Sequence, residues 1–164
     1  MTERTVPRIF APDRRLARYN RALTRQAAGD AARFVFDDMI EDILERFDFT
    51  RAEPGSTLVV GDITGQLSPA LESRGFAVES VGPDEIDEER PYPSTYRYLL
   101  SLGALDTLND LPGALMLMRH ALEPGGMMIA QCLGAGTLPA MRQVVQVADG
   151  ARTHARIHPQ IDRP

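Results

Sequence analysis

The stretch "LVVGDITGQL", residues 58–67, decides the fold of this chain. Three β-forming residues lead into Gly61, and a second glycine follows at Gly65. A glycine at the end of a buried strand lets the backbone approach a ligand, and the N–H groups that open the next helix then face that ligand. The stretch therefore predicts a strand, a binding loop and a helix. Taken alone, the two glycines favour an ordinary tight turn between a strand and a helix.

Segments with strand and helix patterns alternate along the rest of the chain. The predicted strands are 57–61, 76–81, 96–102 and 127–133. The predicted helices are 13–28, 31–47, 66–74, 110–122 and 138–148. Such alternation indicates an α/β fold built from βαβ units around a mostly parallel sheet. Ligands of these folds bind beyond the carboxyl ends of the strands, near the topological switch point.

The composition limits what the chain can do. Its 164 residues are 43% hydrophobic and 25% charged, which is typical of a globular domain. No run of about 18 apolar residues could span a membrane, and the first ten residues lack a secretory h-region. The one cysteine, Cys132, allows no intrachain disulfide and no Cys-rich zinc site, which favours a reducing cytoplasm. We expect Cys132 to be a small core residue.

Arginine supplies every basic charge of the chain. All 18 Lys+Arg residues are arginines, so chemistry that needs a lysine amine is excluded. The net charge of −5 argues against bulk nucleic-acid binding. Residues 1–29 nevertheless predict an Arg-rich helical arm ahead of an α/β domain at 30–164. Such an arm could contact an acidic protein partner or RNA, and a solvated helical face with a narrow apolar seam is the alternative.

Two further sets of residues have a possible chemical role. An acid at the end of the second strand could bind a ribose diol, and Glu79, Asp84 and Glu85 lie around that end. A solvated acidic loop is the alternative. His154 and His158 stand four residues apart, a metal-ligand spacing only within a helix. Their segment has no helical pattern, so we expect unligated histidines and no metal site.

Four segments occur in the order found in class I S-adenosylmethionine-dependent methyltransferases. They are "RIFAPDRRLARYNRA" (8–22), "LVVGDITG" (58–65), "SLGALDTLNDLPGAL" (101–115) and "ALEPGGMMIAQCLGAGTLPAMRQ" (121–143). The chain most resembles the bacterial and mitochondrial branch related to the methyltransferase-like protein that assists respiratory complex I assembly. It is also similar, more distantly, to the malonyl-carrier-protein methyltransferase of biotin synthesis. The resemblance implies a Rossmann-like fold, shortened in the middle and lacking the family's C-terminal strands.

The resemblance also implies a cofactor, S-adenosylmethionine, and residues that hold it. From the methionine end through the ribose to the adenine, these residues are Gly61, Asp62, Gly65, Asp84, Gly103, Ala104 and Leu105. Methyl transfer of this type needs little from the protein beyond in-line placement of the nucleophile and the sulfonium. No catalytic residue is therefore assigned.

Two positions of the loop depart from the family pattern. The acid of the family's first strand aligns with Val59, and a usual glycine aligns with Ile63. Val59 offers no hydrogen bond, and a β-branched residue such as Ile63 resists positive φ. We therefore expect weak cofactor binding or none. Two hypotheses stay open: a divergent methyltransferase, and a non-catalytic assembly or protein-binding module. The complex I relatives also imply a variant in which the same fold hydroxylates an arginine of a protein partner.

Overall fold

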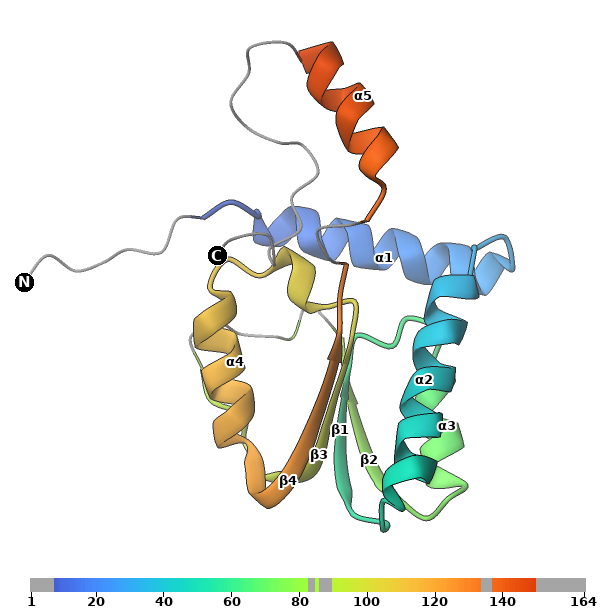
Figure 1. Cartoon of the computed structure of the whole chain (residues 1–164), viewed down its shortest axis with the longest axis vertical. Coiled ribbons are helices and arrows are strands. Elements are labelled where there is room, and N and C mark those ends of the chain that lie inside the picture. The colour runs from blue at the N-terminus through green and yellow to red at the C-terminus, as the bar shows by residue number, and fades with distance from the viewer. Residues whose placement is uncertain (1–7, 83–84, 86–89, 134–136, 150–164) are drawn as a thin grey trace, which may run out of the picture.

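The computed structural model describes residues 8–82, 85, 90–133 and 137–149. These residues form a parallel sheet with helices on both faces (Figure 1). In chain order the elements are α1 (Pro12–Ala28), α2 (Phe34–Thr50), β1 (Ser56–Val60), α3 (Leu67–Glu72), β2 (Ala77–Val81), β3 (Tyr96–Leu102), the 3-10 turn η1 (Leu105–Thr107), α4 (Leu111–His120), β4 (Leu122–Gln131) and α5 (Pro139–Asp149). The predicted α/β fold is thus confirmed, and all four described strands are parallel.

The strand order is β2-β1-β3-β4, and this order creates a switch point. After β1 the chain adds β2 on one side, and it then returns to add β3 on the other side. In the central pairing, Thr57 lies opposite Tyr98 and Val60 lies opposite Ser101. The connections from β1 and β3 therefore diverge at the carboxyl ends of these two strands, where parallel sheets usually bind ligands.

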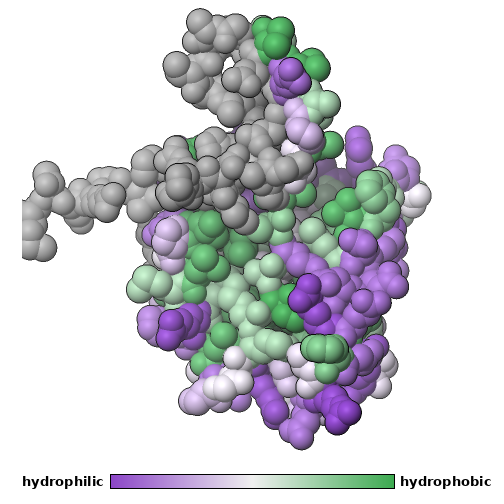
Figure 2. All heavy atoms as spheres, viewed as in Figure 1, coloured by the Kyte–Doolittle hydropathy of each residue, from purple (hydrophilic) through white to green (hydrophobic). Residues whose placement is uncertain are grey.

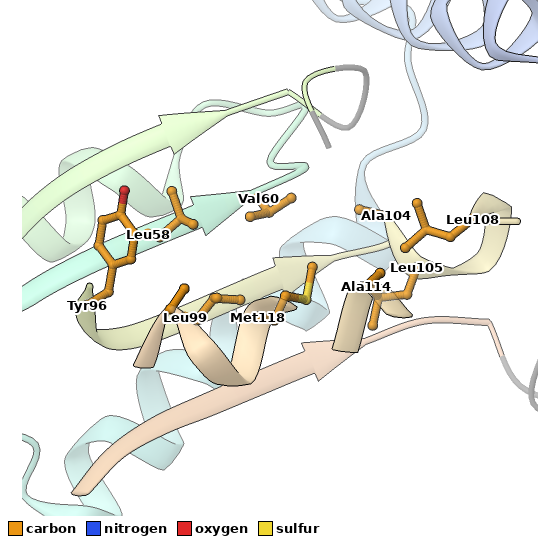
Figure 3. Packing of buried hydrophobic residues seen from close by; sticks show 10 residues of the cluster. Leu58, Val60, Tyr96, Leu99, Ala104, Leu105, Leu108, Ala114 and Met118 are labelled. Atoms are coloured by element: carbon orange, nitrogen blue, oxygen red, sulfur yellow. The ribbon is translucent and has the colours of Figure 1, made fainter. Parts of the chain in front are cut away.

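β1 is buried on both faces, as its unbroken apolar run predicted. Successive side chains of a strand point to opposite faces of the sheet. Leu58 and Val60 pack with residues of α4 (Figure 3). Val59 packs with residues of α2 and α3. None of these three side chains is exposed to solvent. Val59, the residue at the family's acid position, is therefore part of the hydrophobic core.

Three aromatic rings fill the core between α2 and the sheet. Phe47 of α2 has its ring centroid 5.3 Å from that of Phe76 and 5.0 Å from that of Tyr98. Phe76 and Tyr98 are 5.6 Å apart and meet edge to face. All three side chains are buried. Tilted aromatic contacts of this kind stabilise a core beyond the area they bury.

α1 differs from the other helices because it lies across the carboxyl ends of the strands (Figure 1). The structure describes all of α1, and none of its residues is buried. The expected apolar seam is covered only in part: Leu16 and Leu23 are 42% and 38% exposed, and Tyr19 lines a cavity beneath the helix. The helix ends at Gly29, whose left-handed conformation lets its N–H reach the carbonyl oxygens of the last turn.

Several predicted element boundaries differ from the structure. The second helix spans Phe34–Thr50 instead of residues 31–47, with Arg33 as its N-cap. The last strand begins at Leu122 instead of residue 127, because "EPGG" forms a bulge within β4 rather than a turn before it. Tyr96 pairs with Leu122 and Tyr98 pairs with Met127, so the extra residues lie between two paired positions.

β4 is the edge strand of the described sheet, and it gives one face of the molecule its apolar centre. Figure 2 shows hydrophobic residues over the middle of this face, where Figure 1 draws β4, and mostly hydrophilic residues over α2. Met127, Met128 and Ile129 are each half-buried. The sheet is thus covered less completely at β4 than at the central strands.

Candidate functional site

A cavity of about 110 Å³ lies where α1 crosses the carboxyl ends of β1 and β3. Its residues are Gly61, Ile63, Leu102, Gly103 and Thr107 from the strand ends, Phe36 from α2, and Arg15, Arg18, Tyr19 and Ala22 from α1. The cavity lies at the switch point of the sheet. Sites for drug-sized ligands usually have about 300–1,000 Å³. With α1 in this position, the cavity has room for only part of a nucleotide-sized cofactor.

A wider groove lies elsewhere and contains none of the predicted site residues. It has about 580 Å³ and runs along α2 toward α3. Its charged residues include Asp37 and Asp48, which are ion-paired with Arg33 and Arg74 respectively. The groove is open and takes no residue from the ends of β1 and β3, so its size alone does not make it the candidate site.

Gly61 is required by the packing of the loop against β3. Its φ is +86°, and an added Cβ would lie 2.6 Å from the carbonyl oxygen of Leu102 and 3.1 Å from the Cβ of Ala104. Gly61 also donates its N–H to the carbonyl oxygen of Val81, 3.1 Å away. The glycine therefore brings three strand ends together, whether or not a ligand binds beside it. On the other side of the cavity, Gly103 also has a positive φ, of +60°.

Asp62 holds the loop in shape through both of its carboxylate oxygens. Its Oδ1 accepts the N–H of Thr64 at 2.9 Å, the hydroxyl of Thr64 at 2.6 Å and the N–H of Gly65 at 3.1 Å. Its Oδ2 accepts the N–H of Leu67, at 2.9 Å, at the start of α3. The N–H groups that the sequence predicts to face a ligand are therefore already bonded to Asp62.

The other predicted cofactor residues have different surroundings. Gly65 is exposed, and an added Cβ would have no described heavy atom within 4 Å. Ala104 and Leu105 are 1% and 4% exposed and pack in the core on the α4 side, so their side chains do not face the cavity. Asp84 lies outside the described residues. The roles of all these residues in cofactor binding remain predictions.

The α1 wall of the cavity was missed by the sequence analysis. Arg15, Arg18, Tyr19 and Ala22 have the spacing i, i+3, i+4, i+7 of a single helix face, and this spacing was the available signal. The guanidinium of Arg18 lies 3.8 Å from Oδ2 of Asp106 in η1. Asp106 follows the end of β3, where the fold concentrates ligand contacts, so its position in the chain was a second signal.

Asp106 is a buried acid with incomplete hydrogen bonding. Its side chain is 9% exposed, against 58% for Arg18. Its second oxygen, Oδ1, is buried and has no hydrogen-bond partner among the described residues. Burial raises the pKa of the Asp106 carboxyl above its ordinary value, and the guanidinium of Arg18 offsets that rise in part. A buried acceptor without a partner costs free energy. Such acceptors are therefore unusual outside functional sites.

Cys132 follows β4 and is half-buried against the core on the α4 side, so it lies at the edge of the core and not within it as predicted. Burial, together with the negative charge of Asp106, raises the pKa of its thiol. A thiol with a raised pKa stays protonated at neutral pH and is a poor nucleophile.

The described residues contain no group of three or more His, Cys, Asp or Glu side chains placed to hold a metal ion. His154 and His158 lie outside that part of the chain. None of the described helices is both long enough and apolar enough to cross a membrane. No family model matches the chain, and no curated protein matches it. The likeness to methyltransferases therefore rests on the motifs quoted above.

Proposed function

We propose that the chain is a divergent S-adenosylmethionine-dependent methyltransferase whose cofactor binds at the switch point beneath α1. One observation carries the proposal. Gly61 and Gly103, assigned to the cofactor by separate motifs, come from different strands and line the same cavity. Both have a positive φ, a conformation that glycine adopts without strain.

The cavity residues fit part of the cofactor. Tyr19 and Phe36 supply aromatic walls against which a flat group could lie. When bound, the cofactor would supply an electrophilic methyl group. The protein's task is then to exclude water and align the acceptor, and both tasks require α1 to lie over a larger space than the present one.

A non-catalytic assembly module is the second candidate, and Asp62 favours it. The carboxylate of Asp62 bonds to four donors of its own loop, so it could bind a cofactor amino group only by giving up loop contacts. Val59 has no polar side-chain group and is buried in the core, so it offers the cofactor no hydrogen bond. If the chain is such a module, the exposed arginines of α1 would contact a protein partner. The same contact would serve an arginine hydroxylase-like assembly factor on the same fold.

Calorimetric titration with S-adenosylmethionine separates the two candidates. We expect a dissociation constant in the micromolar range. Ala22→Trp would fill the cavity from α1 without touching the loop, and it should weaken binding at least tenfold, which is about 1.4 kcal/mol. Ala27→Trp is the matched control, because Ala27 is exposed on the same helix and does not line the cavity. Absence of heat up to millimolar cofactor would contradict the methyltransferase proposal and favour the non-catalytic module.

A further inference from the structure

α1 meets the domain through a mixed face and not through a buried apolar stripe. Arg15 and Arg18 line the cavity beside Tyr19 and Ala22, and Leu16 and Leu23 are only partly covered, at 42% and 38% exposed. A helix that is permanently fixed to a domain usually buries its apolar stripe against it. Because α1 buries none of its residues, little hydrophobic free energy holds it over the strand ends.

The two ends of α1 are attached in different ways. Just before the helix, Oδ1 of Asn109 accepts the N–H groups of Ile9 and Phe10, both at 2.8 Å. Nδ2 of Asn109 donates to the carbonyl oxygen of Phe10 at 3.0 Å. At the other end, Gly29 has a φ of +73°, and an added Cβ would meet no described heavy atom within 4 Å. The amino-terminal end is thus clamped by hydrogen bonds, while the far end joins α2 through an open glycine turn.

Between these two ends, Arg18 reaches down to Asp106. Their closest charged atoms are 3.8 Å apart, which is near the limit for an ion pair. Arg18 remains more than half exposed, so water screens this contact and weakens it. Asp106 keeps one buried oxygen unpaired. The contact is therefore weak enough to break, and Asp106 has unused capacity to accept a hydrogen bond.

We propose that α1 is a lid over the switch-point cavity and that the Arg18–Asp106 ion pair is its latch. In the closed state the cavity holds only about 110 Å³, so a larger ligand enters after the latch breaks. The apparent affinity for such a ligand then falls in proportion to the fraction of molecules with an open lid. This inference holds for any ligand of the cavity and does not depend on the identity of the cofactor.

Thiol labelling without a ligand tests the lid. Thr107 lines the cavity beneath α1, so the reporter is Thr107→Cys in a Cys132→Ala background, treated with a maleimide fluorophore too large for the closed cavity. Arg18→Gln should speed labelling at position 107 several-fold. Arg21→Gln is the matched control, because Arg21 is exposed on the same helix and does not line the cavity, and it should leave the rate unchanged. A second reporter, Gln66→Cys, lies on an exposed residue and should label at one rate throughout.

Equal labelling at position 107 in the parent and in Arg18→Gln would overturn the proposal, as would equal acceleration by both arginine variants. Asp106→Asn breaks the latch from the other side and should accelerate labelling as Arg18→Gln does. Circular dichroism of each variant must show unchanged helix content, since unfolding of α1 would also expose position 107. If Asp106→Asn does not fold, the two arginine variants alone decide. The assay contains no cofactor, so its result is independent of the calorimetric test.

Discussion

α1 and α2 are consecutive helices of 17 residues each, yet they are attached to the domain in opposite ways. α2 buries Ile40, Ile43 and Phe47 against the sheet, whereas α1 buries nothing and spans a cavity. Full burial of a large apolar side chain contributes about 1.5–3 kcal/mol. The difference therefore assigns the two helices separate tasks: α2 stabilises the fold, and α1 controls access to the strand ends.

The largest effect on the free energy of unfolding is expected when α2 loses an aromatic ring that it packs against the sheet. Phe47 is 3% exposed and touches two other rings, so Phe47→Ala should lower the free energy of unfolding by about 3–5 kcal/mol. Phe49→Ala, on the same helix but 90% exposed, should change it by less than about 0.5 kcal/mol. Urea denaturation measures both values. Similar losses in the two variants would show that α2 is not packed as described.

The two glycines of the loop should respond unequally to one added methyl group. In Gly61→Ala the new Cβ meets a backbone oxygen at 2.6 Å and forces a residue with a Cβ to keep a φ of +86°. We expect a loss of about 2–4 kcal/mol, since left-handed strain and overpacking add together. Gly65→Ala keeps the strain, with a φ of +65°, but meets open space, so about 1–2 kcal/mol should be lost. Thermal or urea unfolding that ranks the two variants in the opposite order would contradict the described loop geometry.

Asp106, which lies beneath α1, should make the free energy of unfolding depend on pH. Because burial raises the pKa of its carboxyl in the folded protein, the folded state binds this proton more tightly than the unfolded state. The free energy of unfolding therefore falls as the pH rises from the ordinary Asp pKa of 3.8 through the raised value. Asp106→Asn removes this loss, so the variant should be the more stable protein at neutral pH. The advantage should disappear at pH values below the ordinary pKa.

Urea unfolding of the parent and Asp106→Asn across this pH range provides the measurement. A constant difference between the two proteins would show that Asp106 does not titrate between the folded and unfolded states. Asp110→Asn is not a suitable control, because the side chain of Asp110 caps α4 by accepting the N–H of Gly113. Asp13→Asn is suitable, because Asp13 is exposed in the first turn of α1.

The smallest effect is expected for a partly covered leucine of α1. Leu23→Ala should lower the free energy of unfolding by about 1 kcal/mol at most, because more than a third of the residue is already exposed. Leu71→Ala in α3 removes a fully buried side chain and should cost about 2–5 kcal/mol. Comparable losses in the two variants, measured by urea denaturation, would mean that Leu23 packs against the domain and that α1 is not a loosely held lid.

The sequence was sufficient for the elements whose burial pattern is local. The run at Leu58–Val60 predicted a strand covered on both faces, and the structure buries each of its side chains completely. The pattern of α1 was equally readable, but periodicity shows only which residues share a face. Periodicity does not show what that face contacts, so it could not predict that Arg15 and Arg18 lie over the strand ends.

Long-range geometry explains the other differences. Asp62 was correctly placed in the loop, but whether its oxygens face a ligand or the loop's own N–H groups depends on backbone angles. Asp106 was overlooked because its neighbour, Arg18, is distant in sequence and arrives from another helix. The start of β4 was misplaced because Pro124 and two glycines normally end a strand, and here a bulge accommodates them.

β4 has a consequence for how the protein behaves in concentrated solution. Among the described strands it pairs with β3 alone, so its outer row of N–H and C=O groups is free of strand partners. Between Pro124 and Gln131 it carries no charged side chain to repel an approaching chain. Open edges of this kind promote self-association. We therefore expect colloidal stability to be limited by this side of the sheet, and a single arginine introduced on β4 to raise solubility more than any change on α1.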